Sequence, residues 1–175
     1  NMSGSAEITI ISPTATITGA TSVCMNAPQP DITFTGANGT APYTFTYRIN
    51  GGGNQTITTI SGNSVTLLAP TNTVGLFTYS LVSVEDASNC SQSASGNAVI
   101  TVWPLPTATI AVNTTTVCQN GTSPIVTFTG ANGTAPYTFS YNIDGGSTIT
   151  VTTISGSSAT VSVPTNIPGT FTYNL

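Results

Sequence analysis

Short runs of alternating apolar and polar residues follow one another along the chain, at intervals of about eight to twelve residues. Because successive side chains of a β-strand point to opposite faces, this alternation predicts half-buried strands. In YTFTYRI, for example, Tyr43, Phe45 and Tyr47 share one face, which we expect to lie in the core. The runs expected to form strands between residues 14 and 102 are TATIT at Thr14, DITFT at Asp31, YTFTYRI at Tyr43, QTITTI at Gln55, SVTLL at Ser64, LFTYSLVSV at Leu76 and AVITV at Ala98.

The whole pattern returns after 94 residues. The phrase FTGANGTAPYTF occurs at Phe34 and again, unchanged, at Phe128. Residues 32–79 and 126–173 are identical at 32 of 48 positions without a gap. A period of this length exceeds the roughly 20–45 residues of solenoid repeats and suits an independent β-sandwich domain. The sequence therefore predicts an all-β chain of tandem sandwich domains, with about seven strands each.

A second similarity marks the domain boundaries. GSAEITI at Gly4 is similar to GNAVITV at Gly96, which contains the last strand expected in the first complete repeat. We expect residues 1–11 to be the closing strand of a preceding repeat, residues 12–103 to be a complete repeat, and residues 104–175 to be a second repeat that lacks its closing strands. The simpler explanation for the missing closing strands is that the polypeptide continues beyond residue 175. The alternative is that a neighbouring chain supplies a strand such as AEITI.

The composition narrows the classes of function. Charged residues make up 3% of the chain, with one Lys or Arg, five Asp or Glu and no His, which gives a net charge of −4. The chain has no basic surface that could neutralise phosphates, so we expect neither nucleic-acid binding nor attachment to anionic lipid. Membrane insertion is not expected either, since no apolar run approaches the ~18 residues of a spanning helix. The first residues do not have the pattern of a signal peptide. If the protein is exported, we therefore expect this chain to be an interior or mature part of it.

These residues resemble a known group of proteins. A cysteine near the start of the unit, followed by ITFTGANGTAPYTFTY, PTN, FTYSL, VEDASNCS and a closing VITV, resembles the Ig-like or PKD-like repeats of long surface adhesins in Bacteroidota. Those adhesins include the SprB-type gliding adhesins exported by the type IX secretion system. The resemblance covers essentially the whole chain and implies an exported, filament-like protein of the bacterial cell surface.

Two functions are consistent with this resemblance. The first is a structural stalk for surface adhesion or gliding motility, whose partners are the neighbouring repeats of the same chain. The alternative is a repeated carbohydrate-binding module, whose partner is a surface polysaccharide.

A disulfide bond is predicted in the complete repeat. Cys24 lies near its start and Cys90 near its end, and an exported location permits the bond. The alternative is that both are buried free thiols. Cys118 aligns with Cys24, and its partner would lie beyond the last residue.

The repeated loop is the candidate ligand site. It could recur only because the fold recurs, or it could present the same ligand contact on every domain and so provide avidity. The candidate residues are Asn38, Gly39, Thr40 and Pro42 in the first repeat and Asn132, Gly133, Thr134 and Pro136 in the second.

The remaining polar and aromatic candidates are isolated. Glu85, Asp86 and Asn89 could supply oxygen ligands to Ca²⁺ or could form a turn after a strand. Trp103 could stack on a sugar ring or pack against the next domain.

No catalytic activity is expected. The chain has no His to act as a base, and the adjacent Glu85 and Asp86 would point to opposite faces of a strand. No cofactor or bound metal is expected.

Overall fold

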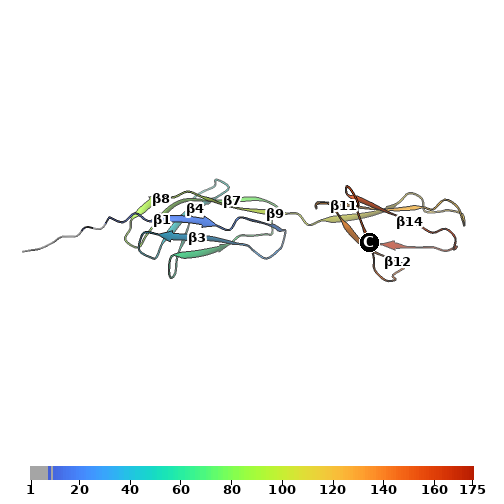
Figure 1. Cartoon of the computed structure of the whole chain (residues 1–175), viewed down its shortest axis with the longest axis horizontal. Coiled ribbons are helices and arrows are strands. Elements are labelled where there is room, and N and C mark those ends of the chain that lie inside the picture. The colour runs from blue at the N-terminus through green and yellow to red at the C-terminus, as the bar shows by residue number, and fades with distance from the viewer. Residues whose placement is uncertain (1–7, 9) are drawn as a thin grey trace, which may run out of the picture. The chain divides into compact units, whose positions relative to one another are not determined.

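The structure is a computed structural model that describes Ile8 and residues 10–175 (Figure 1). This part of the chain is built from β-strands and contains no helix. It divides into two compact units, Asn1–Trp103 and Pro104–Leu175, called unit 1 and unit 2 below. Most of the expected closing strand within residues 1–11 lies outside the described residues.

Unit 1 is a β-sandwich of the Ig-like type, made from two sheets. Its smaller sheet has the order β1-β3-β6, and every pair is antiparallel. Its larger sheet has the order β2-β9-β7-β4-β5, with β8 also paired to β7. The smaller sheet contains β1 (Thr14–Thr18), β3 (Asp31–Ala37) and β6 (Ser64–Leu68). The larger contains β2 (Thr21–Cys24), β4 (Thr44–Ile49), β5 (Gln55–Thr58), β7 (Gly75–Glu85), β8 (Ser91–Ser93) and β9 (Asn97–Trp103).

The alternating face predicted from YTFTYRI forms part of the core. Tyr43, Phe45 and Tyr47 are buried, and the Phe45 ring stacks on Phe34 of the other sheet with centroids 5.7 Å apart. Aromatic rings in such offset arrangements add to the stability that burial of their apolar area provides. The prediction that this face lies in the core is confirmed.

The N-terminal edge of unit 1 crosses from one sheet to the other, which the sequence pattern did not reveal. β1 pairs with β3, whereas β2 pairs in parallel with β9. Gly19 lies between them with a φ of 119°, and a Cβ atom there would lie 2.1 Å from the carbonyl oxygen of Asp31. Only glycine accommodates both this conformation and this close approach. β2 and β8 together raise the strand count of unit 1 above the expected seven.

Unit 2 repeats most of this arrangement. One sheet has the order β10-β11-β14 and the other the order β13-β12-β15, all antiparallel. Phe128 and Phe139 stack with centroids 5.7 Å apart, as Phe34 and Phe45 do in unit 1. The strands are β10 (Thr107–Val112), β11 (Ile125–Ala131), β12 (Thr138–Ile143), β13 (Ile149–Thr152), β14 (Ser158–Ser162) and β15 (Tyr173–Asn174).

The predicted disulfide between Cys24 and Cys90 is wrong in this structure, where both cysteines are free thiols, as is Cys118. Cys24 ends β2 at the end of the sheet where β7 begins, with β9 between the two strands, whereas Cys90 follows the turn after the last residue of β7. An 11-residue strand is about 35 Å long. A disulfide needs Cα atoms within about 7 Å, so the two cysteines lie at opposite ends of the sheet and cannot bond. Cys24 is also exposed rather than buried.

Candidate functional site

The repeated loop of unit 1 is held by hydrogen bonds within its own domain. The Gly39 backbone N–H donates to the Tyr43 hydroxyl oxygen (3.1 Å), and Asn38 Nδ2 donates to Thr14 Oγ1 (3.1 Å). The Tyr43 backbone N–H donates to Thr59 Oγ1 (2.9 Å), and the Thr59 N–H donates back to the Tyr43 carbonyl oxygen (2.9 Å). The loop is therefore fixed at both ends.

Unit 2 reproduces these contacts atom for atom. The Gly133 N–H donates to the Tyr137 hydroxyl (3.0 Å), and Asn132 Nδ2 donates to Thr107 Oγ1 (3.3 Å). The Tyr137 N–H donates to Thr153 Oγ1 (3.0 Å). The recurrence of the phrase is thus explained by a recurring local structure.

Two further features of the phrase have structural causes. A Cβ atom on Gly36 would lie 2.5 Å from the Tyr43 ring, and one on Gly130 would lie 2.5 Å from the Tyr137 ring. Asn38 and its counterpart adopt positive φ values of 58° and 61°, a conformation that Asn tolerates better than most residues. The packing of the loop therefore requires the glycine, and its backbone conformation favours the asparagine.

The loop leaves few groups for a ligand. Thr40 and Pro42 are exposed, as are Thr134 and Pro136. Both prolines follow cis peptide bonds. The side chains of Asn38 and Asn132 are exposed but already donate to a threonine. Ligand binding by these loops stays a prediction.

In unit 1 a second loop is tied to the first through Asp86. Asp86 Oδ2 accepts from the Thr40 N–H (2.9 Å), and Oδ1 accepts from the N–H groups of Ser88 (2.9 Å) and Cys90 (3.0 Å). The Thr40 bond, with those of Cys90 and Ser88, lowers the pKa of the Asp86 carboxyl, and burial opposes this effect without reversing it. Asp86 is therefore a structural carboxylate that joins two loops.

The candidate oxygen ligands for Ca²⁺, Glu85, Asp86 and Asn89, do not converge. Both carboxylate oxygens of Asp86 are occupied by N–H donors. Glu85 is the exposed last residue of β7, and Asn89 occupies the turn with a φ of 60°. Among the described residues, no three His, Cys, Asp or Glu side chains are grouped so that they could hold a metal ion. The turn interpretation of this segment matches the observed contacts.

Trp103 is the last residue of β9 and of unit 1. Its side chain is 57% exposed, and its carbonyl oxygen accepts from the Met25 N–H (2.8 Å). Stacking of a sugar ring on Trp103 stays a prediction.

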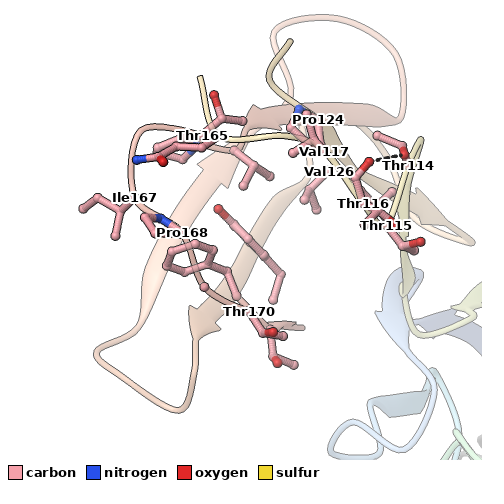
Figure 2. Close-up of a pocket in the computed structure, with 18 of the residues that line it drawn as sticks. Thr114, Thr115, Thr116, Val117, Pro124, Val126, Thr165, Ile167, Pro168 and Thr170 are labelled. Carbon is pink, nitrogen blue, oxygen red and sulfur yellow. Dashed lines mark hydrogen bonds between the residues drawn. The ribbon is translucent and has the colours of Figure 1, made fainter. Parts of the chain in front are cut away.

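Unit 2 contains a cleft with a volume of about 610 Å³. Figure 2 shows Val117 and residues 114–116 on one side of it, and Ile167, Pro168 and Thr170 on the other. Ile110 and Val126 also line it. The signal for the cleft was present in the alignment of the repeats, because its two sides correspond to the strands that flank β9 in unit 1.

Comparisons with known proteins assign neither a family nor a function to this chain. No family model matches the chain, and no curated protein matches it. Among solved structures, the chain is similar to one described as showing the host cell surface retention of a 1.5-MDa bacterial ice-binding adhesin. The TM-score is 0.47 and the identity 14%, over 87% of this chain and 54% of that chain. This chain thus spans about half the length of that one, and a similarity at this level assigns no function.

The described part of the chain holds no helix of the length and apolarity needed to cross a membrane.

Proposed function

We propose that this chain is a structural stalk segment of an exported bacterial cell-surface adhesin. Its role is to space a binding site away from the cell, and its partners are the neighbouring repeats of the same polypeptide. The chain has no catalytic role in this proposal. Export by type IX secretion and a part in gliding motility are included because the repeat pattern resembles that of the gliding adhesins.

The observation that carries the proposal is the location of the residues that the two units share. The shared glycines, tyrosines and threonines of the loop contact one another, and the shared aromatic residues fill the two cores. Repetition has preserved what each domain needs in order to fold. Such preservation is what a spacer made of independent domains requires.

Charged surface groups, in contrast, differ between the units. Exposed Arg48 aligns with Asn142, and exposed Asp31 aligns with Ile125. A ligand held by charge on every domain would need the same charged group in both units. The residues that the two units share include no charged side chain, which suits a spacer.

The location is tested by labelling intact cells of the producing organism with antibodies raised against residues 12–103. Surface labelling is expected, and removal of the type IX translocon should abolish it. An antibody against a cytoplasmic protein serves as the control for cell integrity. Labelling that appears only after permeabilisation contradicts the proposal.

The carbohydrate-binding alternative is tested on a polysaccharide array with the 175-residue chain. The stalk proposal expects no saturable binding. Saturable binding that is lost in Trp103→Ala, or in the double variant Asn38→Ala with Asn132→Ala, would establish the alternative instead. Gly53→Ala is the matched control, because a Cβ atom there meets nothing within 4 Å.

A further inference from the structure

Four asparagines of this chain are followed directly by glycine. They are Asn38, Asn50, Asn120 and Asn132. All four are exposed, and all have positive φ values between 50° and 61°. The backbone nitrogen of the following residue can attack an asparagine side chain, and glycine hinders this attack least because it has no Cβ. Sequence, exposure and backbone conformation therefore do not distinguish the four pairs.

The hydrogen bond made by the glycine N–H does distinguish them. The Gly39 and Gly133 N–H groups each donate to a tyrosine hydroxyl, and the Gly121 N–H donates to a backbone carbonyl oxygen (2.9 Å). Among the described residues, no group accepts a hydrogen bond from the Gly51 N–H. Of the four glycine nitrogens, that of Gly51 is thus the one that can react without first breaking a hydrogen bond.

The side chain of Asn50 is held and polarised in the turn between β4 and β5. The Asn50 N–H donates to the Thr78 carbonyl oxygen (2.9 Å), and the Thr78 N–H donates to Asn50 Oδ1 (2.8 Å). An N–H donor at this oxygen stabilises the negative charge that develops there when a nucleophile attacks the carbon. The turn therefore places a polarised side-chain amide next to an N–H that makes no hydrogen bond.

Unit 2 has the same turn with aspartate in place of asparagine. Asp144 aligns with Asn50 and has a φ of 51°. Its N–H donates to the Thr172 carbonyl oxygen (2.9 Å), and its Oδ1 accepts from the Thr172 N–H (2.7 Å). These two bonds correspond to those between Asn50 and Thr78. The turn thus accommodates aspartate with the same contacts.

Unit 2 also has the acceptor that unit 1 lacks. The Gly145 N–H donates to Asn142 Oδ1 (2.9 Å). Asn142 aligns with Arg48, whose guanidinium has donors only and cannot accept this bond. Arg48 Nε donates instead to Asn54 Oδ1 (2.6 Å). One difference between the repeats therefore explains why the N–H of Gly145 is bonded and that of Gly51 is not.

We propose that Asn50 is a site of spontaneous deamidation, which converts it to the aspartate that unit 2 has at the same position. The Gly51 nitrogen loses its proton and bonds to Asn50 Cγ, while the Cγ–Nδ2 bond breaks and Nδ2 leaves with that proton as ammonia. Water then opens the succinimide ring at either carbonyl carbon, which gives aspartate or isoaspartate. The net reaction consumes one water and releases one ammonia, and it needs no oxidant or reductant.

The modification changes the surface of unit 1. It adds one negative charge to a chain whose net charge is −4 and whose single basic residue is Arg48. The aspartate product makes the turn of unit 1 match that of unit 2 at this position, whereas isoaspartate lengthens the backbone of the turn. The inference is independent of the proposed stalk function.

Ageing of the intact 175-residue chain at mildly alkaline pH compares the four sites in one sample. Peptide mapping by mass spectrometry detects the exchange of NH₂ for OH at each site. Asn50 should react about tenfold faster than Asn38, Asn120 and Asn132, because at those sites a hydrogen bond of the glycine N–H must break first. In denaturant all four should react at similar rates. Equal rates in the folded chain, or a faster reaction at any of the other three, overturn the proposal.

Substitutions at Arg48 test the cause of the difference. Arg48→Asn introduces the acceptor present in unit 2 and should slow the reaction at Asn50 about tenfold. Arg48→Lys is the matched control, because lysine also has no acceptor and should leave the rate unchanged. Arg48 is exposed on β4, so neither change alters the core. A reaction in Arg48→Asn that is as fast as in the wild type contradicts the role assigned to the Gly51 N–H.

The reciprocal changes transfer the reaction to unit 2. Asp144→Asn alone creates an Asn-Gly pair whose glycine N–H still donates to Asn142, so position 144 should react slowly. Asp144→Asn combined with Asn142→Arg removes that acceptor, and position 144 should then react as fast as Asn50. A double variant that reacts no faster at position 144 than the single variant overturns the proposal that this acceptor controls the reaction.

Discussion

Unit 1 and unit 2 are identical at 32 of 48 aligned positions, but some of the shared residues are buried to different extents. Tyr79 is 2% exposed, whereas its counterpart Tyr173 is only partly buried. Phe34 and Phe128, in contrast, are both completely buried. Tyr79 pairs with β9, and Phe34 belongs to the opposite sheet. The burial of this tyrosine thus depends on the strands around it and not on the residue itself.

The largest expected effect is a difference between the two units in the stability lost when this tyrosine is removed. Tyr79→Ala should destabilise unit 1 by about 3–5 kcal/mol, the cost of removing a buried aromatic side chain. Tyr173→Ala should cost unit 2 less, because that ring is only partly buried. Hydrogen exchange read by mass spectrometry follows each unit separately within the intact chain. Equal losses in the two units would show that β9 does not account for the difference.

A smaller effect should be the same in both units. Gly36→Ala and Gly130→Ala each force a methyl group against a tyrosine ring, and such overpacking costs about 1–3 kcal/mol. Urea unfolding of the single variants gives the two values. Gly53→Ala, which meets open space, should change stability little. Tolerance of alanine at only one of the two sites would mean that the loops are not equivalent.

Removal of the tyrosine hydroxyls should cost less stability than the glycine substitutions. Tyr43→Phe and Tyr137→Phe each remove the acceptor of a glycine N–H, at a cost of about 0.5–1.5 kcal/mol. In unit 1 the loop retains its second attachment, from Thr40 to Asp86. Local exchange at Gly133 should therefore accelerate more than at Gly39. Faster exchange at Gly39 would show that the Asp86 contact does not hold the loop.

The smallest expected effect on stability occurs only at acid pH and only in unit 1. The native pKa of Asp86 is lowered, so its carboxylate stabilises the fold fully above the unfolded-state pKa of about 3.9. This contribution is lost as the pH falls through the lower native pKa. Asp86→Asn should remove that part of the acid dependence of unit 1, while Glu85→Gln should not. Unfolding midpoints measured between neutral and strongly acid pH provide the check, and an unchanged acid profile in Asp86→Asn would contradict the assignment.

The sequence predicted the strands well where alternation was strong. The all-β class and the seven strands expected in unit 1 follow from the alternation of residues such as Tyr43, Phe45 and Tyr47. β2 and β8 were missed because they are short and carry few apolar residues, so that only their neighbours define them.

The candidate site was less predictable than the fold. The Cys24–Cys90 pairing assumed that residues near the two ends of a domain sequence meet in space, whereas the length of β7 separates them. For Asp86 the sequence indicated only a turn. Its hydrogen bond to Thr40 could not be predicted, because it joins residues 46 positions apart. Contacts at such separations depend on the complete topology and leave no local pattern.

The parallel pairing of β2 with β9 also bears on how unit 1 would respond to tension. β2 belongs to the N-terminal part of the unit and β9 leads out of it, and the two run side by side over four residue pairs from Thr21 to Cys24. A pull on the two ends of the unit draws parallel strands past each other lengthwise. Their hydrogen bonds are then loaded together in shear instead of being opened one at a time, so the pair resists extension as a clamp.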